Sequence, residues 1–100
     1  MTVEEKLQRS IAITDRETKA YVYAARAAGL TQAYVGDAVK LWTMNTLAEH
    51  YRSLPAADDP GMDAQILADL DALADAANAA FDAGDPLPKP PGKYATVLHG

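Results

Sequence analysis

The sequence predicts an all-α protein, a small bundle of about four helices followed by an extended, proline-rich C-terminal arm. Apolar residues recur at intervals of three and four along long stretches of the chain, which is the period of one helix face. Capping residues, glycine or proline bound these stretches. The hydrophobic content of 49% is rich in alanine, which allows helices to pack closely. We assign residues 1–84 to the bundle and residues 85–100 to the arm, within one domain.

The stretch from Thr31 to Arg52 is predicted to be the central helix. It holds the only tryptophan, Trp42. When this stretch is wound as a helix with about 3.6 residues per turn, its apolar side chains cover well over half of the circumference. A helix on the protein surface has only one apolar face, so this helix is expected to run through the middle of the bundle. These side chains belong to Tyr34, Val35, Ala38, Val39, Leu41, Trp42, Met44 and Ala48.

The chain before this stretch is predicted to form two helices. Thr2–Glu5 reads as a capping box that begins the first helix. Its apolar face is formed by Val3, Leu7 and Ile11. A second capping box at Thr14–Glu17 predicts a new helix start, although one continuous helix over residues 3–28 is the alternative. Gly29 supplies the left-handed residue that ends the helix, and Thr31 is expected to cap the central helix.

The last helix is predicted over residues 60–83. A loop rich in proline and aspartate precedes it, with Asp59 as N-cap and Pro60 at the first helical position. Its buried stripe is formed by Ile66, Leu70, Leu73, Ala77 and Phe81. Gly84 ends the helix, and residues 85–93 contain four prolines, which favour an extended or polyproline II chain. The apolar residues 94–100 are expected to dock on the bundle.

Composition excludes several classes of function. The chain has no cysteine, which excludes disulfides, thiolate catalysis and cysteine-ligated metals and suits a reducing cytoplasm. No apolar run is long enough to predict a signal peptide or a membrane span. Residues 1–52 hold seven Lys/Arg and six Asp/Glu, whereas residues 53–100 hold two Lys and eight Asp. The net charge of −5 disfavours direct nucleic-acid binding. It favours a basic partner or, as the more common alternative, simply keeps the protein soluble.

A helix-turn-helix is the first motif that the sequence suggests. Ala25, Gly29, Leu30, Val35 and Ala38 match its packing positions. The recognition helix would offer few groups that read DNA, and these are Gln32, Tyr34 and Lys40. Without an arginine at its start, this motif is retained only as an alternative.

Two charged surfaces are the candidate binding sites. Asp71, Asp75 and Asp82 lie at helical spacing on the face opposite the buried stripe, with Asn78 between them. Carboxylates about 6 Å apart along a helix imitate the phosphates of a nucleic-acid strand and fit a Lys/Arg channel. A basic patch on the second predicted helix consists of Arg16, Lys19, Tyr23 and Arg26. Each surface has an ordinary alternative interpretation as a solvated helix face.

No catalytic, cofactor or metal site is predicted. The two histidines, His50 and His99, have no companions at ligand spacing. Neither a nucleophile elbow nor a glycine-rich phosphate loop is present in the sequence. We therefore expect a non-enzymatic protein.

An acidic, alanine-rich, cysteine-free helical chain of 100 residues that presents Asp71, Asp75 and Asp82 resembles, in overall type, the small phage-encoded anti-CRISPR proteins. The resemblance covers the profile of the whole chain and includes no diagnostic motif. It implies an inhibitor in the bacterial host cytoplasm that binds an RNA-guided surveillance complex and blocks nucleic-acid access. The first half of the chain is not acidic, which favours a mixed, shape-specific interface over pure charge mimicry.

The leading hypothesis is therefore a non-enzymatic inhibitor that binds a basic, nucleic-acid-binding protein or complex of the host. A small helix-turn-helix DNA-binding regulator is the alternative. A phage structural or assembly protein is the second alternative, and the sequence leaves the oligomeric state open.

Overall fold

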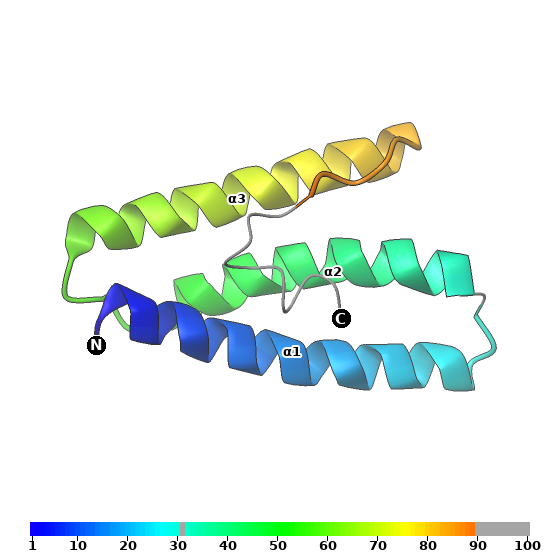
Figure 1. The fold of residues 1–100 in the computed structure, drawn as a ribbon, viewed down its shortest axis with the longest axis horizontal. Helices are drawn as coiled ribbons and strands as arrows, with labels where there is room; N and C mark the ends of the chain where they lie inside the picture. Colours follow the sequence, from blue (N-terminus) through cyan, green and yellow to red (C-terminus); the bar gives the residue numbers. More distant parts are fainter. Residues whose placement is uncertain (31, 90–100) are drawn as a thin grey trace.

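The computed structural model describes residues 1–30 and 32–89, with side chains for all of these except residues 32–35. Three helices make up this part of the chain: α1 (Val3–Ala27), α2 (Gln32–Ser53) and α3 (Pro60–Ala83). Figure 1 shows α2 between the other two helices, and α2 is the helix that packs against both. The predicted all-helical class is confirmed, and the described residues contain no strand.

The predicted number of four helices is wrong, because α1 is continuous through the second capping pattern. The first capping box forms as expected: Glu5 N–H donates to Thr2 Oγ1 at 3.0 Å, and Thr2 N–H donates to Glu5 Oε1 at 3.4 Å. Thr14 is instead fully buried, and its hydroxyl donates to Ser10 O at 2.8 Å. A threonine inside a helix commonly uses its hydroxyl in this way, by donating to the carbonyl four residues earlier. Thr14 therefore does not act as the N-cap of a new helix. The continuous helix is the alternative that the structure supports.

Both helix ends at glycine behave as predicted. Gly29 has a φ of 79° and Gly84 a φ of 74°, the left-handed region that glycine adopts without a steric cost. After α1, Leu30 N–H donates to Ala25 O at 3.2 Å, which closes a Schellman turn. After α3, Asp85 N–H donates to Ala80 O at 2.9 Å in the same way. The predicted cap at Thr31 lies outside the described residues.

The start of α3 also agrees with the sequence. Asp59 has an extended backbone, and its Oδ1 accepts from Met62 N–H at 3.1 Å. Pro60 lies in the first turn of the helix, where backbone N–H groups have no acceptor within the helix, so the lack of an N–H in proline costs no hydrogen bond. The helix therefore begins at the residue that the aspartate–proline pair indicates.

The hydrophobic core lies in two separate clusters. The main cluster joins all three helices and consists of Leu7, Met44, Leu47, Ala48, Tyr51, Ile66, Leu70 and Ala77. The smaller cluster lies between α1 and α2 and consists of Ala25 and Val39, with Tyr21 and Val22 packed against it. Trp42 is only partly buried, and its ring stacks on Tyr21 with centroids 5.1 Å apart and planes at 9°. The Trp-bearing helix is central, although its tryptophan is not at the centre of the core.

After Gly84 the chain leaves helical structure. Residues 85–89 have no regular secondary structure, and Leu87 packs against the main cluster. Residues 90–100, which include the predicted docking segment, lie outside the described residues. Within the described part, no helix is both long and apolar enough to cross a membrane.

Candidate functional site

The predicted aspartate stripe lies along α3 with unequal exposure. Asp75 and Asp82 are exposed on the helix surface. Asp71 is partly covered, because its Oδ1 pairs with Arg52 Nη2 of α2 at 2.6 Å. Two of the three predicted carboxylates are therefore open to a partner, whereas the charge of the third is already balanced within the protein.

The stripe borders α2 instead of lying on the face opposite the core. Asn78, in the middle of the stripe, is half-buried and exchanges hydrogen bonds with Asn45 of α2 at 2.9 and 3.3 Å. Each amide also donates to a carbonyl of its own helix, Leu41 O and Ala74 O, at 2.9 Å. The stripe is thus a flank of α3, and Asn78 anchors that flank to its neighbour.

All charged side chains of α3 are negative. It contains five aspartates and no lysine, arginine or histidine. Asp69, which the predicted stripe omits, is exposed, and its Oδ1 accepts from Gln65 Nε2 at 2.9 Å. The spacing of Asp69 places it off the predicted stripe, which is why the sequence pattern missed it. The exposed aspartates of α3 are therefore Asp75 and Asp82 on the stripe and Asp69 on a different face of the helix.

The predicted basic patch lies on α1. Arg16, Lys19, Tyr23 and Arg26 are all exposed, and Tyr23 is 80% exposed. The last three line a hollow of about 310 Å³ together with Asp15, Thr18 and Val22. Lys19 also pairs with Asp15 within α1, with Nζ and Oδ2 3.0 Å apart. Lys19 is thus paired within α1, whereas Arg16 and Arg26 are exposed and no ion pair among the described residues involves them.

The acidic and basic surfaces do not form one site. They lie on α3 and α1, which flank α2 on different sides (Figure 1). The sequence predicted two separate candidate surfaces, and the fold places them on two outer helices. A single partner that contacts both surfaces would have to span α2.

The geometry around Gly29 differs from that of a helix-turn-helix. Helices of that motif cross at roughly 90–120°. Here α1 and α2 lie antiparallel along their length (Figure 1), and Thr18 contacts Thr43 while Glu17 contacts His50. Lys40 is exposed, and the side chains of Gln32 and Tyr34 lie outside the described set. An αα-hairpin of this kind provides no separate recognition helix, which counts against the DNA-reading alternative.

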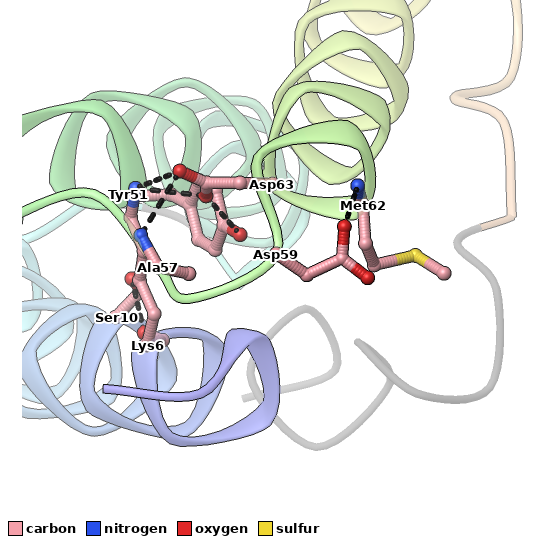
Figure 2. A network of polar contacts seen from close by, with 7 residues as sticks. All are labelled: Lys6, Ser10, Tyr51, Ala57, Asp59, Met62 and Asp63. Carbon is pink, nitrogen blue, oxygen red and sulfur yellow. Dashed lines mark hydrogen bonds and ion pairs between the residues drawn. The ribbon is translucent and has the colours of Figure 1, made fainter.

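A polar network that the sequence did not indicate joins the three helices at the N-terminal end of α1 (Figure 2). Lys6 Nζ donates to both carboxylate oxygens of Asp63, at 2.9 and 3.1 Å. Tyr51 Oη donates to Asp63 Oδ1 at 2.7 Å, and Ala57 N–H donates to Oδ2 at 3.2 Å. Lys6 Nζ also lies 4.4 Å from the centroid of the Tyr51 ring. Lys6 is only 5% exposed, although lysine is seldom buried unless it is paired.

This network lowers the pKa of Asp63. The hydrogen bond from the Tyr51 hydroxyl contributes most and the bond from Lys6 comes next, while partial burial opposes them, and the pKa falls from 3.8 to about 2. The carboxylate is therefore ionised at neutral pH, with both oxygens occupied by donors. A group in this state is a poor general base, because its proton affinity is low and its lone pairs are in use. Its evident effect is to hold α1, α2 and α3 together.

A hollow of about 450 Å³ lies beside the network, between the start of α1 and the loop that joins α2 to α3. Its lining is mostly apolar, with Lys6, Arg52 and Asp63 as the charged members. All three of these groups already have partners within the protein. At the same end of the bundle, the N-terminal ammonium pairs with Asp58 Oδ1 at 3.2 Å, and Asp58 N–H donates to Met1 O at 2.8 Å. These contacts fasten the loop to α1.

The described residues contain no group of three or more His, Cys, Asp or Glu side chains arranged to hold a metal ion. His50 Nε2 contacts Glu17 Oε2 at 2.8 Å, which links α2 to α1. His99 lies outside the described residues. Comparison with protein-family models, with curated proteins and with solved structures gave no significant match.

Proposed function

We propose that this protein is a non-enzymatic inhibitor that binds a basic, nucleic-acid-binding protein and blocks the access of nucleic acid to it. The exposed flank of α3 that carries Asp75 and Asp82 is the contact surface. These carboxylates pair with lysine or arginine side chains that otherwise hold phosphates.

One observation carries the proposal: α3 is an outer helix that packs on α2 and exposes several carboxylates with no cation of its own. Arg52 of α2 balances Asp71, but among the described residues no ion pair involves Asp75 or Asp82. Carboxylates spaced along a rigid helix lose little side-chain freedom on binding, because aspartate is short. The surface is therefore suited to a partner with a row of cations.

The basic patch on α1 gives the protein a second type of surface. Tyr23 and Arg26 are residues that interfaces favour as anchors. We propose that they contact an acidic or apolar edge of the same partner, beside the cationic channel. A two-part interface of this kind gives shape specificity in addition to charge attraction.

The resemblance to anti-CRISPR proteins suggests which partner to test, namely an RNA-guided surveillance complex. Purified complexes of several types are mixed with labelled target DNA in a gel-shift assay, with and without the protein. We expect the protein to abolish the shift for at least one type. Unchanged DNA binding across the series would count against an inhibitor of such complexes.

A charge-matched pair of variants locates the contact surface. The variant D75K/D82K reverses two charges on α3, whereas D37K/E49K reverses two exposed charges on α2. Asp71 is left intact because its replacement would also break the pair with Arg52. We expect the α3 variant to lose inhibition and the α2 variant to retain it, with equal helicity by circular dichroism. Equal loss in both variants would show that net charge matters and that the flank of α3 does not.

A further inference from the structure

A layer of polar side chains crosses the middle of the bundle and separates the two hydrophobic clusters. Between α1 and α2 it contains Thr14, Thr18 and Thr43, which are at most 2% exposed. Between α2 and α3 it contains the reciprocal amide pair Asn45 and Asn78. We refer to these five residues as the polar layer.

Two of the three hydroxyls of the polar layer donate to carbonyls of their own helices. Thr43 Oγ1 donates to Val39 O at 2.7 Å, so its proton is used within α2. Thr18 is then the donor in the 3.1 Å contact between Thr18 Oγ1 and Thr43 Oγ1. Thr14 Oγ1 donates back to Ser10 O. The Thr18–Thr43 contact is therefore the hydroxyl bond of this layer that joins α1 to α2, at a position where a hydrophobic core would hold apolar side chains. Its net contribution to stability is small, because the two hydroxyls would bond to water in the unfolded chain.

Beyond the polar layer lies a part of the hairpin with little apolar burial. We call residues 19–30 and 36–40 the hairpin tip; Leu41, which packs against the main cluster, lies outside it. Its buried hydrophobic residues are Ala25 and Val39, with Tyr21 and Val22 partly buried beside them. The main cluster on the other side of the layer contains eight buried residues from three helices. The hairpin tip is therefore held by much less buried apolar area.

The third helix does not cover the hairpin tip. The buried residues of α3 end at Ala77, and Figure 1 shows α3 diverging from the α1–α2 pair toward its C-terminal end. The face of α2 changes accordingly. Leu47 and Tyr51 are fully buried, whereas Lys40, one heptad before Leu47 on the same face, is exposed.

We propose that the hairpin tip opens as a unit while the main cluster below the polar layer stays folded. Local opening of this kind follows the boundary between regions of high and low buried contact. Lys19, Tyr23 and Arg26 belong to the tip, so opening also rearranges the basic patch and its hollow. The opening requires no partner and is a property of the free protein.

Native-state amide hydrogen exchange, followed residue by residue by NMR, tests the proposal. In the wild-type protein we expect amides of the hairpin tip to exchange at least about 10-fold faster than amides of α2 and α3 that flank the main cluster. Equal protection in the two regions would overturn the proposal. Residues 19–27 and 36–40 of the tip are helical, as are the compared segments of α2 and α3, so the comparison is made between these helical amides.

Two variants with small losses of core volume then separate local from global opening. Ile66 is a buried member of the main cluster on α3. We expect I66V to lower the protection of core amides by about 2- to 12-fold, as a typical Ile→Val loss implies, and to leave tip amides unchanged. The tip opens without disturbing Ile66, so its opening constant is independent of that side chain. An equal loss in tip amides would show one cooperative unit and overturn the proposal.

The reciprocal variant is V39A in the smaller cluster. We expect it to lower the protection of tip amides, because the closed tip loses part of its main apolar contact. Unchanged tip protection would show that this cluster does not hold the tip closed, which also overturns the proposal. Both substitutions are conservative, and circular dichroism verifies that the variants remain folded.

Discussion

The amide pair between α2 and α3 allows one prediction to be worked through in numbers. Asn78→Ala removes the two hydrogen bonds with Asn45, at 2.9 and 3.3 Å, and the bond from Asn78 to Ala74 O. Each hydrogen bond contributes about 0.5–1.5 kcal/mol net, and a partly buried partner left unsatisfied adds a further penalty. Alanine regains some tenths of a kcal/mol through its helix propensity. We expect a loss of about 1–3 kcal/mol in the free energy of unfolding.

Asn45→Ala should cost a similar amount, because it breaks the same pair from the other side. In the double variant the pair is absent, and neither amide remains unsatisfied. The double variant should therefore be more stable than the sum of the single losses predicts, by about 1 kcal/mol. Each kcal/mol corresponds to a shift in Tm of about 4–8 °C for a domain of this size.

Urea unfolding followed by circular dichroism at the helical minimum measures all four proteins of this double-mutant cycle. The m-values should agree, which shows that the same surface is exposed on unfolding. A coupling below about 0.5 kcal/mol would show that the two amides act independently. The reasoning that the pair fixes α2 against α3 would then be wrong.

Three further predictions concern single sites. The pKa of Asp63 is lowered from 3.8 to about 2, so the stability that its carboxylate contributes is complete above about pH 4–5 and is lost as the pH falls toward 2. Asp63→Asn should therefore reduce the dependence of the unfolding free energy on pH between about pH 5 and 2. An unchanged dependence would contradict this prediction. Gly36→Ala should stabilise the protein by about 0.5–1 kcal/mol and raise Tm, because Gly36 lies within α2 and an added Cβ meets nothing within 4 Å. Gly84→Ala should destabilise it by about 1 kcal/mol and lower Tm, because the φ of Gly84 is 74°. Shifts of Tm in the same direction would refute the assignment of Gly84 to the helix end. Tyr21→Ala should move the Trp42 fluorescence maximum to longer wavelength, because the stacked ring that shields the indole is removed; an unshifted spectrum would contradict the stacking.

Local patterns in the sequence were sufficient for the helix ends. The capping box at Thr2, the Asp59–Pro60 start and the glycine ends at Gly29 and Gly84 each involve residues within five positions of one another. Their geometry is set by short segments of backbone, so the amino-acid types predict it. The second capping pattern failed, because burial of Thr14 against α2 leaves its hydroxyl to the preceding turn.

The candidate surfaces were predictable only in part. Helical spacing alone placed Asp75 and Asp82 on one exposed flank. The same spacing could not show that Arg52 balances Asp71 or that Asn78 faces α2, because both depend on how α3 rotates against its neighbour. The exposure of a polar residue is decided by packing, which spacing within one helix does not contain.

What the amino-acid order determined by itself is the helical class, the helix ends marked by Thr2, Gly29, Asp59 and Gly84, and the uneven charge, because these follow from local backbone preferences and from composition. Only the packed structure decided the ion pair of Lys6 with Asp63 and the contact of Lys6 with the Tyr51 ring, partners that lie 57 and 45 positions away along the chain. The same is true of the polar layer that divides the core. Contacts of this kind form when burial makes an unpaired charge or hydroxyl costly, and that cost arises only once three helices exclude water from one place.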